Sequence, residues 1–211
     1  AAHHGILRKL SNENPQTANY SILALARSDY EKGVNYLLSS RGESGLWEVF
    51  GQPQPGISAI AARGLLGSER PEIREKAYSV LDWLLTLQKE DGSIHDGRVS
   101  VYTTSVAIGA LIEGKREEDI PHIKRAVAYL RAIQTDESEG YSPENKFYGG
   151  IGYGGDLRPD LSNLQYALQA LHEANVSKED PAFQRAMYFL NRSQNHSESN
   201  FETYYDRIKK L

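Results

Sequence analysis

A short polar sequence, Asp160-Leu161-Ser162-Asn163, follows a loop rich in glycine and tyrosine and stands at the start of a predicted helix. The free N–H groups of a helix start carry partial positive charge and favour polar or anionic groups. A carboxyl group held neutral by its neighbours could donate a proton from such a position. Asp and Ser also cap helices without any further role. Asp160 and Ser162 are therefore candidate catalytic residues, with helix capping as the competing interpretation.

A second loop brings two carboxylates and an imidazole together at Asp91, His95 and Asp96. Paired carboxylates roughly 5–10 Å apart are the groups that hydrolyse glycosidic bonds. The Asp91-Gly92 step is equally typical of an ordinary turn. This loop raises a carbohydrate-active lyase or hydrolase as a minor alternative.

Aromatic side chains gather at predicted helix starts and in the glycine-rich loop, where they could offer π faces to an apolar ligand or a sugar. Trp47 belongs to the same class, although aromatic residues can equally wedge the loops between helices. With the polar residues of the same segments, these aromatics give the predicted ligand-binding set: Tyr102, Thr104, Phe147, Tyr148, Tyr153, Asp156, Arg158 and Asn163.

The histidines and the absence of cysteine argue against a metal centre. Without cysteine the chain has no disulfide, no Cys-based zinc site and no Cys nucleophile. His122 and His172 stand on predicted helices without a partner at ligand spacing, which favours surface or linking roles. We predict no metal and no cofactor.

The elements that must position these residues are repeated. One phrase combines a basic residue, a small residue, an aromatic-Leu pair and Gln or Arg, and its first copies add Gly and a large apolar residue. Its full or partial copies run from Lys32 to Trp47, Trp83 to Ile94, Arg125 to Gln134 and Arg185 to Gln194. An Ala-rich phrase lies upstream of each copy and ends at Leu25, Leu65, Leu111 and Leu171. Internal repeats of this length indicate a repeat architecture.

Both phrases predict helices, because small and apolar residues recur three and four positions apart. The Ala-rich helix is nearly free of charge and should be buried on most sides, whereas the second helix carries charge on one face and should lie outside. The first unit should follow the same scheme, with helices at 22–25 and 32–37. Inner and outer helices that alternate along the chain describe a ring or superhelix of α-hairpins.

The phrase that contains Gln or Arg, which is the second of each pair along the chain, resembles the QW repeat of squalene–hopene cyclases. The first copy has the family's basic residue, Gly, aromatic residue, Leu, Gly and Trp at the family's spacing, with Arg41 in place of Gln. The second copy keeps Gln88 and Gly92 and has Ile94 in place of Trp. The resemblance covers roughly residues 19–198. It implies an all-α fold, the α/α toroid that terpenoid cyclases share with protein prenyltransferase β subunits and complement-type thioester domains.

The same resemblance bears on activity. Class II terpenoid cyclases protonate their substrate with the second Asp of an Asp-x-Asp-Asp motif, and alignment on the 167–171 phrase places residues 160–163 over it. Only Asp160 is kept, and the hydroxyl of Ser162 at the donor position cannot protonate an alkene. Prenyltransferases need a zinc held by Asp, Cys and His, and thioester domains need a Cys, which this chain lacks.

Charge and hydropathy exclude further classes. The 24 basic and 28 acidic residues give a net charge of −4 with no basic stripe, so nucleic acid is not an expected partner. No apolar window approaches the ~18 residues of a membrane span. No signal peptide is visible, although a mature form would not carry one. We expect a soluble protein, either cytoplasmic or the mature form of a periplasmic or exported one.

The expected domain plan is an N-terminal segment at 1–18, a repeat domain at 19–200 and a helical tail at 201–211. The repeat units lie near 19–50, 56–97, 101–156 and 161–198, and the extra length of the third falls in its glycine-rich loop. A ring of six hairpins needs more than 211 residues. The toroid is therefore expected to be incomplete or open, to close with a second chain as an oligomer, or to lack residues near 26–30 and 198–203.

Two function classes follow. The first is a cyclase-like or prenyltransferase-like toroid that binds an apolar isoprenoid or lipid in a central cavity without the standard acid. The second is a noncatalytic toroid that binds a protein, peptide or glycan partner on its concave face.

Overall fold

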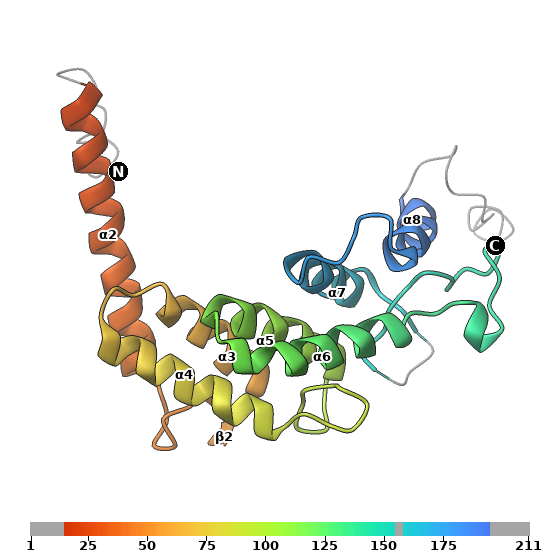
Figure 1. The fold of residues 1–211 in the computed structure, drawn as a ribbon, viewed down its shortest axis with the longest axis horizontal. Helices are drawn as coiled ribbons and strands as arrows, with labels where there is room; N and C mark the ends of the chain where they lie inside the picture. The colour runs from red at the N-terminus through yellow and green to blue at the C-terminus, as the bar shows by residue number, and fades with distance from the viewer. Residues whose placement is uncertain (1–14, 155–157, 195–211) are drawn as a thin grey trace, which may run out of the picture.

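The computed structural model describes residues 15–154 and 158–194, with side chains from residue 23 onward. Helices dominate this part of the chain (Figure 1). In chain order the elements are α2 (Pro15–Ser39), β1 (Glu48–Val49), β2 (Gln52–Pro53), α3 (Pro55–Leu66), α4 (Pro71–Thr86), α5 (Ser100–Gly114), η1 (Glu117–Asp119), α6 (Ile120–Ala132), η2 (Glu137–Glu139), α7 (Leu161–Glu173) and α8 (Pro181–Ser193). The predicted segment at 1–18 falls largely, and the tail at 201–211 wholly, outside the described residues.

The Ala-rich phrases form α3, α5 and α7, which lie in a row. α5 packs against α3 on one side and against α7 on the other. Small residues allow this close approach, and Ala59, Ala62, Ala107 and Ala110 are fully buried. The predicted inner helices of the last three units are therefore confirmed.

The charged phrases form the outer layer. α4 packs on α3 and α5, α6 packs on α5 and α7, and α8 packs on α7. Proline begins α4 and α8, where its missing N–H costs nothing. Asp180 caps α8 by accepting a hydrogen bond from the N–H of Ala182 at 2.9 Å. Inner and outer helices alternate, and the predicted all-α, toroid-like fold is confirmed.

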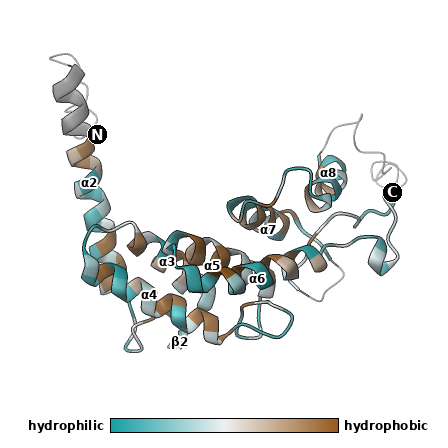
Figure 2. Ribbon diagram, viewed as in Figure 1, coloured by the Kyte–Doolittle hydropathy of each residue, from teal (hydrophilic) through white to brown (hydrophobic). Residues whose placement is uncertain are grey.

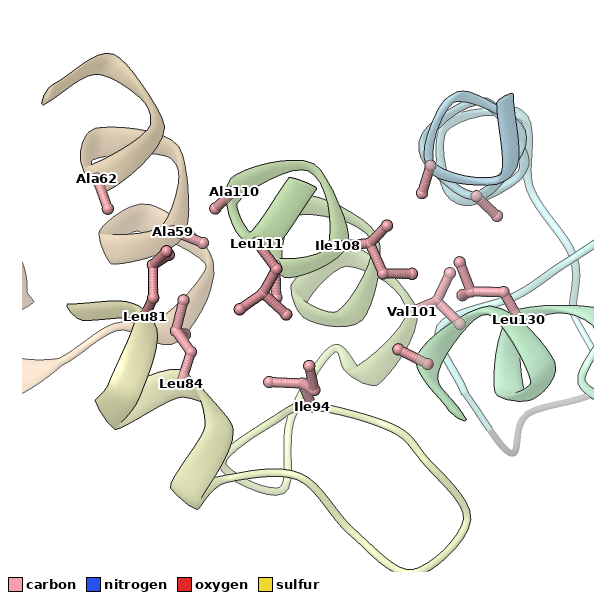
Figure 3. Close-up of a cluster of buried hydrophobic side chains, with 14 of the residues drawn as sticks. Ala59, Ala62, Leu81, Leu84, Ile94, Val101, Ile108, Ala110, Leu111 and Leu130 are labelled. Atoms are coloured by element: carbon pink, nitrogen blue, oxygen red, sulfur yellow. The ribbon is translucent and has the colours of Figure 1, made fainter. Parts of the chain in front are cut away.

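The core lies between the two layers. Figure 3 shows Leu81 and Leu84 of α4, Ile108 and Leu111 of α5 and Leu130 of α6 pointing into one cluster, which Ile94 closes from the loop before α5. Hydrophobic segments of α3 and α5 face each other within the fold (Figure 2). Each buried leucine of this kind contributes about 1.5–3 kcal/mol to folding.

The repeated Gln of the second phrase makes a repeated set of contacts. The side-chain Nε2 of Gln88 donates to the carbonyl of Gly92 at 3.1 Å and to that of His122, at the start of α6, at 3.0 Å. Gln134 donates in the same way to Gly149 and to Ala182, at the start of α8, at 2.9 Å each. Each Gln thus ties its own loop to the next outer helix.

The glycines of these loops are required by the same geometry. Gly92 and Gly149 have φ values of 93° and 80°, which L-residues with a side chain rarely adopt. A Cβ atom on Gly92 would lie 2.3 Å from the carbonyl oxygen of Arg125, and one on Gly149 would lie 1.8 Å from that of Arg185. The loop backbone therefore lies directly against the next outer helix.

The first unit does not have the predicted hairpin. Its two phrases lie in one continuous helix, α2, which projects from the end of the row (Figure 1). Residues 26–31 contain neither Gly nor Pro to break a helix. Leu23 is exposed, and α2 contacts the rest of the fold through its C-terminal half, where Val34 is buried and Tyr30 donates to the carbonyl of Gly64 at 2.8 Å.

The loops carry further detail. β1 and β2 form a small antiparallel hairpin that sequence patterns did not predict, with Glu48 paired to Pro53 and Val49 to Gln52. The extra residues of the third unit lie between α6 and α7 and include η2, so the predicted insertion is in a loop.

Candidate functional site

Asp160 caps α7 with both carboxylate oxygens engaged. Its Oδ1 accepts from the N–H groups of Ser162 and Asn163 at 2.9 Å and from Ser162 Oγ at 2.6 Å, and its Oδ2 accepts from Asn163 Nδ2 at 2.6 Å. Burial alone would raise the pKa of Asp160, but the hydrogen bonds from Ser162 and Asn163 outweigh it and lower the pKa below its usual value. The carboxylate is held ionised, which suits a cap and not a proton donor.

The cap is joined to α5 through an aromatic cluster. The hydroxyl of Tyr102 donates to Ser162 Oγ at 2.6 Å. Its ring lies 5.8 Å from that of Tyr153 and 4.9 Å, edge to face, from that of Tyr166. The loop before α7, the start of α5 and the middle of α7 thus meet at Tyr102.

A pocket of about 190 Å³ opens beside this cluster, between the N-terminal ends of α3 and α5. Its wall is mostly apolar, with Asp96 as its charged group. The lining residues are Gln54, Pro55, Gly56, Ile57, Ile60, Asp96, Val99, Tyr102, Thr103, Val106 and Tyr166.

A second pocket of about 280 Å³ continues along the same helices. It shares Ile60, Val106 and Tyr166 with the first, so we call the two together the inner groove. Its further lining residues are Arg63, Ser105, Gln169, Ala170 and Glu173. The inner groove changes from apolar and aromatic at one end to polar at the other.

The structure brings part of the predicted ligand-binding set to this groove. Tyr102 lines it, and Tyr153 and Ser162 contact Tyr102. Asn163 is buried beneath the cap. Thr104 is turned away, because its buried hydroxyl accepts from the N–H of Ile94 at 2.9 Å and pins the preceding loop.

Other members of that set lie elsewhere. Tyr148 is buried between the third loop and α8, where its hydroxyl donates to Glu137 at 2.6 Å and its ring meets that of Tyr188 edge to face. The ring of Phe147 lies under the ammonium of Lys146. Arg158 is exposed in the loop before α7, and Asp156 lies outside the described residues. Phe147 and Tyr148 pack in the loop between α6 and α7, and neither residue lines the inner groove.

Trp47 has the same structural role in the first loop. It is buried, and its indole Nε1 donates to Ser40 Oγ at 3.1 Å. It therefore wedges the loop that connects α2 to α3.

The two carboxylates of the second loop have different hydrogen-bond partners. Hydrogen bonding by Ser93 is the main cause of a lowered pKa at Asp91. Burial would raise the pKa of Asp96, but hydrogen bonds from Arg98 outweigh it and lower the pKa. Burial lowers the pKa of His95, whose Nδ1 accepts from the N–H of Gly97 at 2.8 Å. Neither carboxyl is held protonated as the acid of a glycosidase must be.

The other two histidines among the described residues, His122 and His172, occupy structural or surface positions. His122 Nδ1 lies 2.6 Å from Gln88 Oε1, and His172 is exposed on α7. Within residues 15–154 and 158–194, no group of three His, Asp or Glu side chains is placed to hold a metal ion.

Sequence patterns did not predict the residues of the inner helices that line the groove. Ile57 and Ile60 of α3, Val106 of α5 and Tyr166 of α7 line the groove, and all but Val106 are exposed. The available signal was the helical spacing of large apolar residues opposite the small-residue stripe, which gives each inner helix a second apolar face. An inner helix with two apolar faces packs on one and lines a cavity with the other.

The fold and the groove define a helical repeat domain of the toroid class. Comparison with protein families matches residues 57–207 to the squalene-hopene cyclase C-terminal domain, which covers well over half of the chain. The chain therefore belongs to this family, within the terpenoid cyclase-like superfamily. A comparison with curated proteins finds no match. In the part of the chain that the structure describes, the helices are too short or too polar to cross a membrane.

Proposed function

We propose that the inner groove binds an apolar ligand of isoprenoid or lipid type. The observation that carries this proposal is the pair of exposed isoleucines on α3, Ile57 and Ile60, which face the groove beside Tyr102 and Tyr166. Large apolar side chains gathered in a pocket, rather than scattered singly, are typical of ligand and partner sites. Membership of the cyclase-like family supports the same ligand class.

The proposed binding does not use the standard cyclase acid. The motif position holds Asp160, whose pKa is lowered and which caps α7, and Ser162, whose hydroxyl bridges Asp160 to Tyr102. Protonation of an alkene needs a carboxylic acid that is held protonated and aimed at the alkene. We therefore propose that any chemistry on the ligand starts from another group. We also propose that the repeated phrases are QW-type repeats whose Gln side chains hold the scaffold of the groove.

Binding of the neutral fluorescent dye Nile red tests the groove. We expect Ile60→Asp to weaken dye binding about tenfold or more, because a carboxylate against an apolar ligand is costly to desolvate. Met187→Asp on α8 is the matched control, since Met187 is 50% exposed and Ile60 is 55% exposed. The control should bind as the wild type does. Equal effects of the two substitutions would exclude the groove as the apolar site.

Native mass spectrometry before and after organic extraction tests the ligand class. We expect an isoprenoid or lipid adduct that extraction removes, and the same spectra report the oligomeric state. The absence of any apolar adduct, together with dye binding that is indifferent to Ile60→Asp, would contradict the proposal.

A glycan or peptide ligand is the second candidate. It is favoured by the exposed rings of Tyr153 and Tyr166 at the groove and by the carboxylate of Asp96 in its wall. Sugar rings stack on such aromatic faces, and carboxylates accept their hydroxyl hydrogens. This candidate predicts that soluble oligosaccharides, and not isoprenoids, compete with Nile red.

A further inference from the structure

The polar end of the inner groove is built by three helices. Arg63 comes from α3, Ser105 from α5, and Gln169 and Glu173 from α7. Arg63 Nη2 lies 3.1 Å from Glu173 Oε1, and Arg63 Nη1 lies 3.1 Å from Glu173 Oε2, so the pair is bidentate. Gln169 Nε2 donates to the same Glu173 Oε1 at 3.0 Å.

Gly109 of α5 makes room for this ion pair. A Cβ atom there would lie 2.8 Å from Arg63 Nη1 and 2.8 Å from Glu173 Oε2. The two charges are thus held against the backbone of α5 and neutralise each other. The polar end offers hydrogen-bonding groups without a free charge.

Ser105 provides the observation that points to a ligand. It is 4% exposed and lines the second pocket, and its Oγ has no hydrogen-bond partner among the described residues. A buried hydroxyl without a partner is unfavourable, because it has lost water and gained nothing in return. One donor and two acceptor sites are available on it. Gln169 retains a second amide hydrogen for a ligand.

We propose that this polar end binds the hydroxyl group of an uncharged amphiphilic alcohol whose hydrocarbon tail lies along Ile60, Val106 and Tyr166. The proposal rests on the proposed apolar ligand and names its head group. A hydroxyl both donates and accepts, which matches Ser105 and Gln169. A phosphate or carboxylate would need an unpaired cation, and Arg63 is engaged by Glu173.

The size of the inner groove agrees with such a ligand. Its two pockets of about 190 Å³ and 280 Å³ adjoin at the three shared residues. Together they fall within the ~300–1,000 Å³ of typical small-molecule sites.

Displacement of Nile red by three fifteen-carbon isoprenoids tests the head group. Farnesol carries a hydroxyl, farnesene is the hydrocarbon, and farnesyl diphosphate carries the charged head. We expect farnesol to compete about fivefold or more better than farnesene, the ratio that one neutral hydrogen bond gives. Ser105→Ala should bring this ratio close to one and leave the affinity for farnesene unchanged.

Ser79→Ala is the matched control, because the hydroxyl of Ser79 is exposed on α4 and donates to the carbonyl of Glu75 at 3.1 Å. It should keep the wild-type ratio. Ser105→Ala should also leave the melting temperature unchanged or raise it, which separates loss of the ligand contact from loss of structure.

The outcomes are distinct. Equal affinities of the wild type for farnesol and farnesene would overturn the hydroxyl site and leave the apolar groove standing. Strongest binding of farnesyl diphosphate would overturn the uncharged head group. Failure of all three to displace the dye would overturn the hydroxyl site and the proposed function together.

Discussion

Asp160 shows how neighbours decide what a carboxyl group can do. Four hydrogen bonds from two residues converge on it, and all of them favour the charged form. A class II cyclase acid needs the reverse, a carboxyl group whose proton is kept. The expected alignment of Ser162 with the donor position of the motif and the lowered pKa of Asp160 both argue against proton donation here.

Asp160→Ala should remove the cap of α7 and lower the free energy of unfolding by about 1 kcal/mol at neutral pH. The pKa of Asp160 is lower in the folded state, so its stabilisation is complete above the unfolded-state pKa and is lost as the pH falls through the folded-state pKa. The difference between wild type and variant should shrink below about pH 4. Urea unfolding at a series of pH values measures it.

Asp160→Asn is the control for this prediction. It retains a capping oxygen and has no charge to titrate, so its difference from the Ala variant should not change with pH. A full-size difference between wild type and Asp160→Ala that persists at pH 3 would show that the cap does not depend on the charge.

The site could be predicted from the sequence only in part, and the reason is physical. Tyr102 and Asp160 were proposed because helix starts have marked sequences and a known direction, and of the two Tyr102 lines the inner groove. Ile60 and Tyr166 were not found, because an exposed apolar residue on one helix acquires meaning only when neighbouring helices are placed beside it. Phe147 and Tyr148 are aromatic like Tyr102 but lie in the loop between α6 and α7.

Among the elements, the loops after α4 and α6 are tightly constrained. Each is fixed by a Gln side chain on one side and by a glycine backbone on the other. Gly149 has a positive φ and also lies against the carbonyl of Arg185, whereas Gly140 has a similar φ of 82° and open space around its Cα. A comparison of Gly140 with Gly149, which both lie between α6 and α7, therefore distinguishes the cost of backbone strain from the cost of steric contact.

Gly140→Ala should cost about 1–2 kcal/mol, the strain of a left-handed L-residue. Gly149→Ala should cost more by a further ~1–3 kcal/mol, because its new Cβ must displace the start of α8 as overpacking does. Chemical denaturation of both variants measures the difference. Equal losses would mean that the loop moves away from α8 without cost.

The helices themselves were largely predictable. The alternation of Ala-rich and charged phrases gave α3 to α8, because burial on one face or on most faces leaves a direct mark on composition. The prediction for the first unit was wrong. Its two phrases are closer together and have no Gly or Pro between them, so they continue as one helix. The left-handed residue that ends α5 is Lys115, with a φ of 53°, although a glycine directly precedes it.

At the scale of the whole molecule, the inner helices α3, α5 and α7 form a row in which an ion pair joins the two outer members. α3 and α7 each pack on α5, and the bidentate contact of Arg63 with Glu173 bridges them across its backbone at Gly109. This ion pair joins residues that are 110 positions apart in the sequence. The pair also lines the polar end of the inner groove, and we expect it to help set how α3 and α7 face each other.

A double-mutant cycle of Arg63→Met and Glu173→Gln tests this bridge. The side chains are 39% and 21% exposed, so we expect a coupling energy of about 0.5–1 kcal/mol that falls in 1 M salt. The exposed pair of Lys32 and Asp29, within one turn of α2, is the control and should give about half as much or less. A coupling no larger than that of the control would mean that packing on α5 alone, and not the ion pair, sets how α3 and α7 face each other.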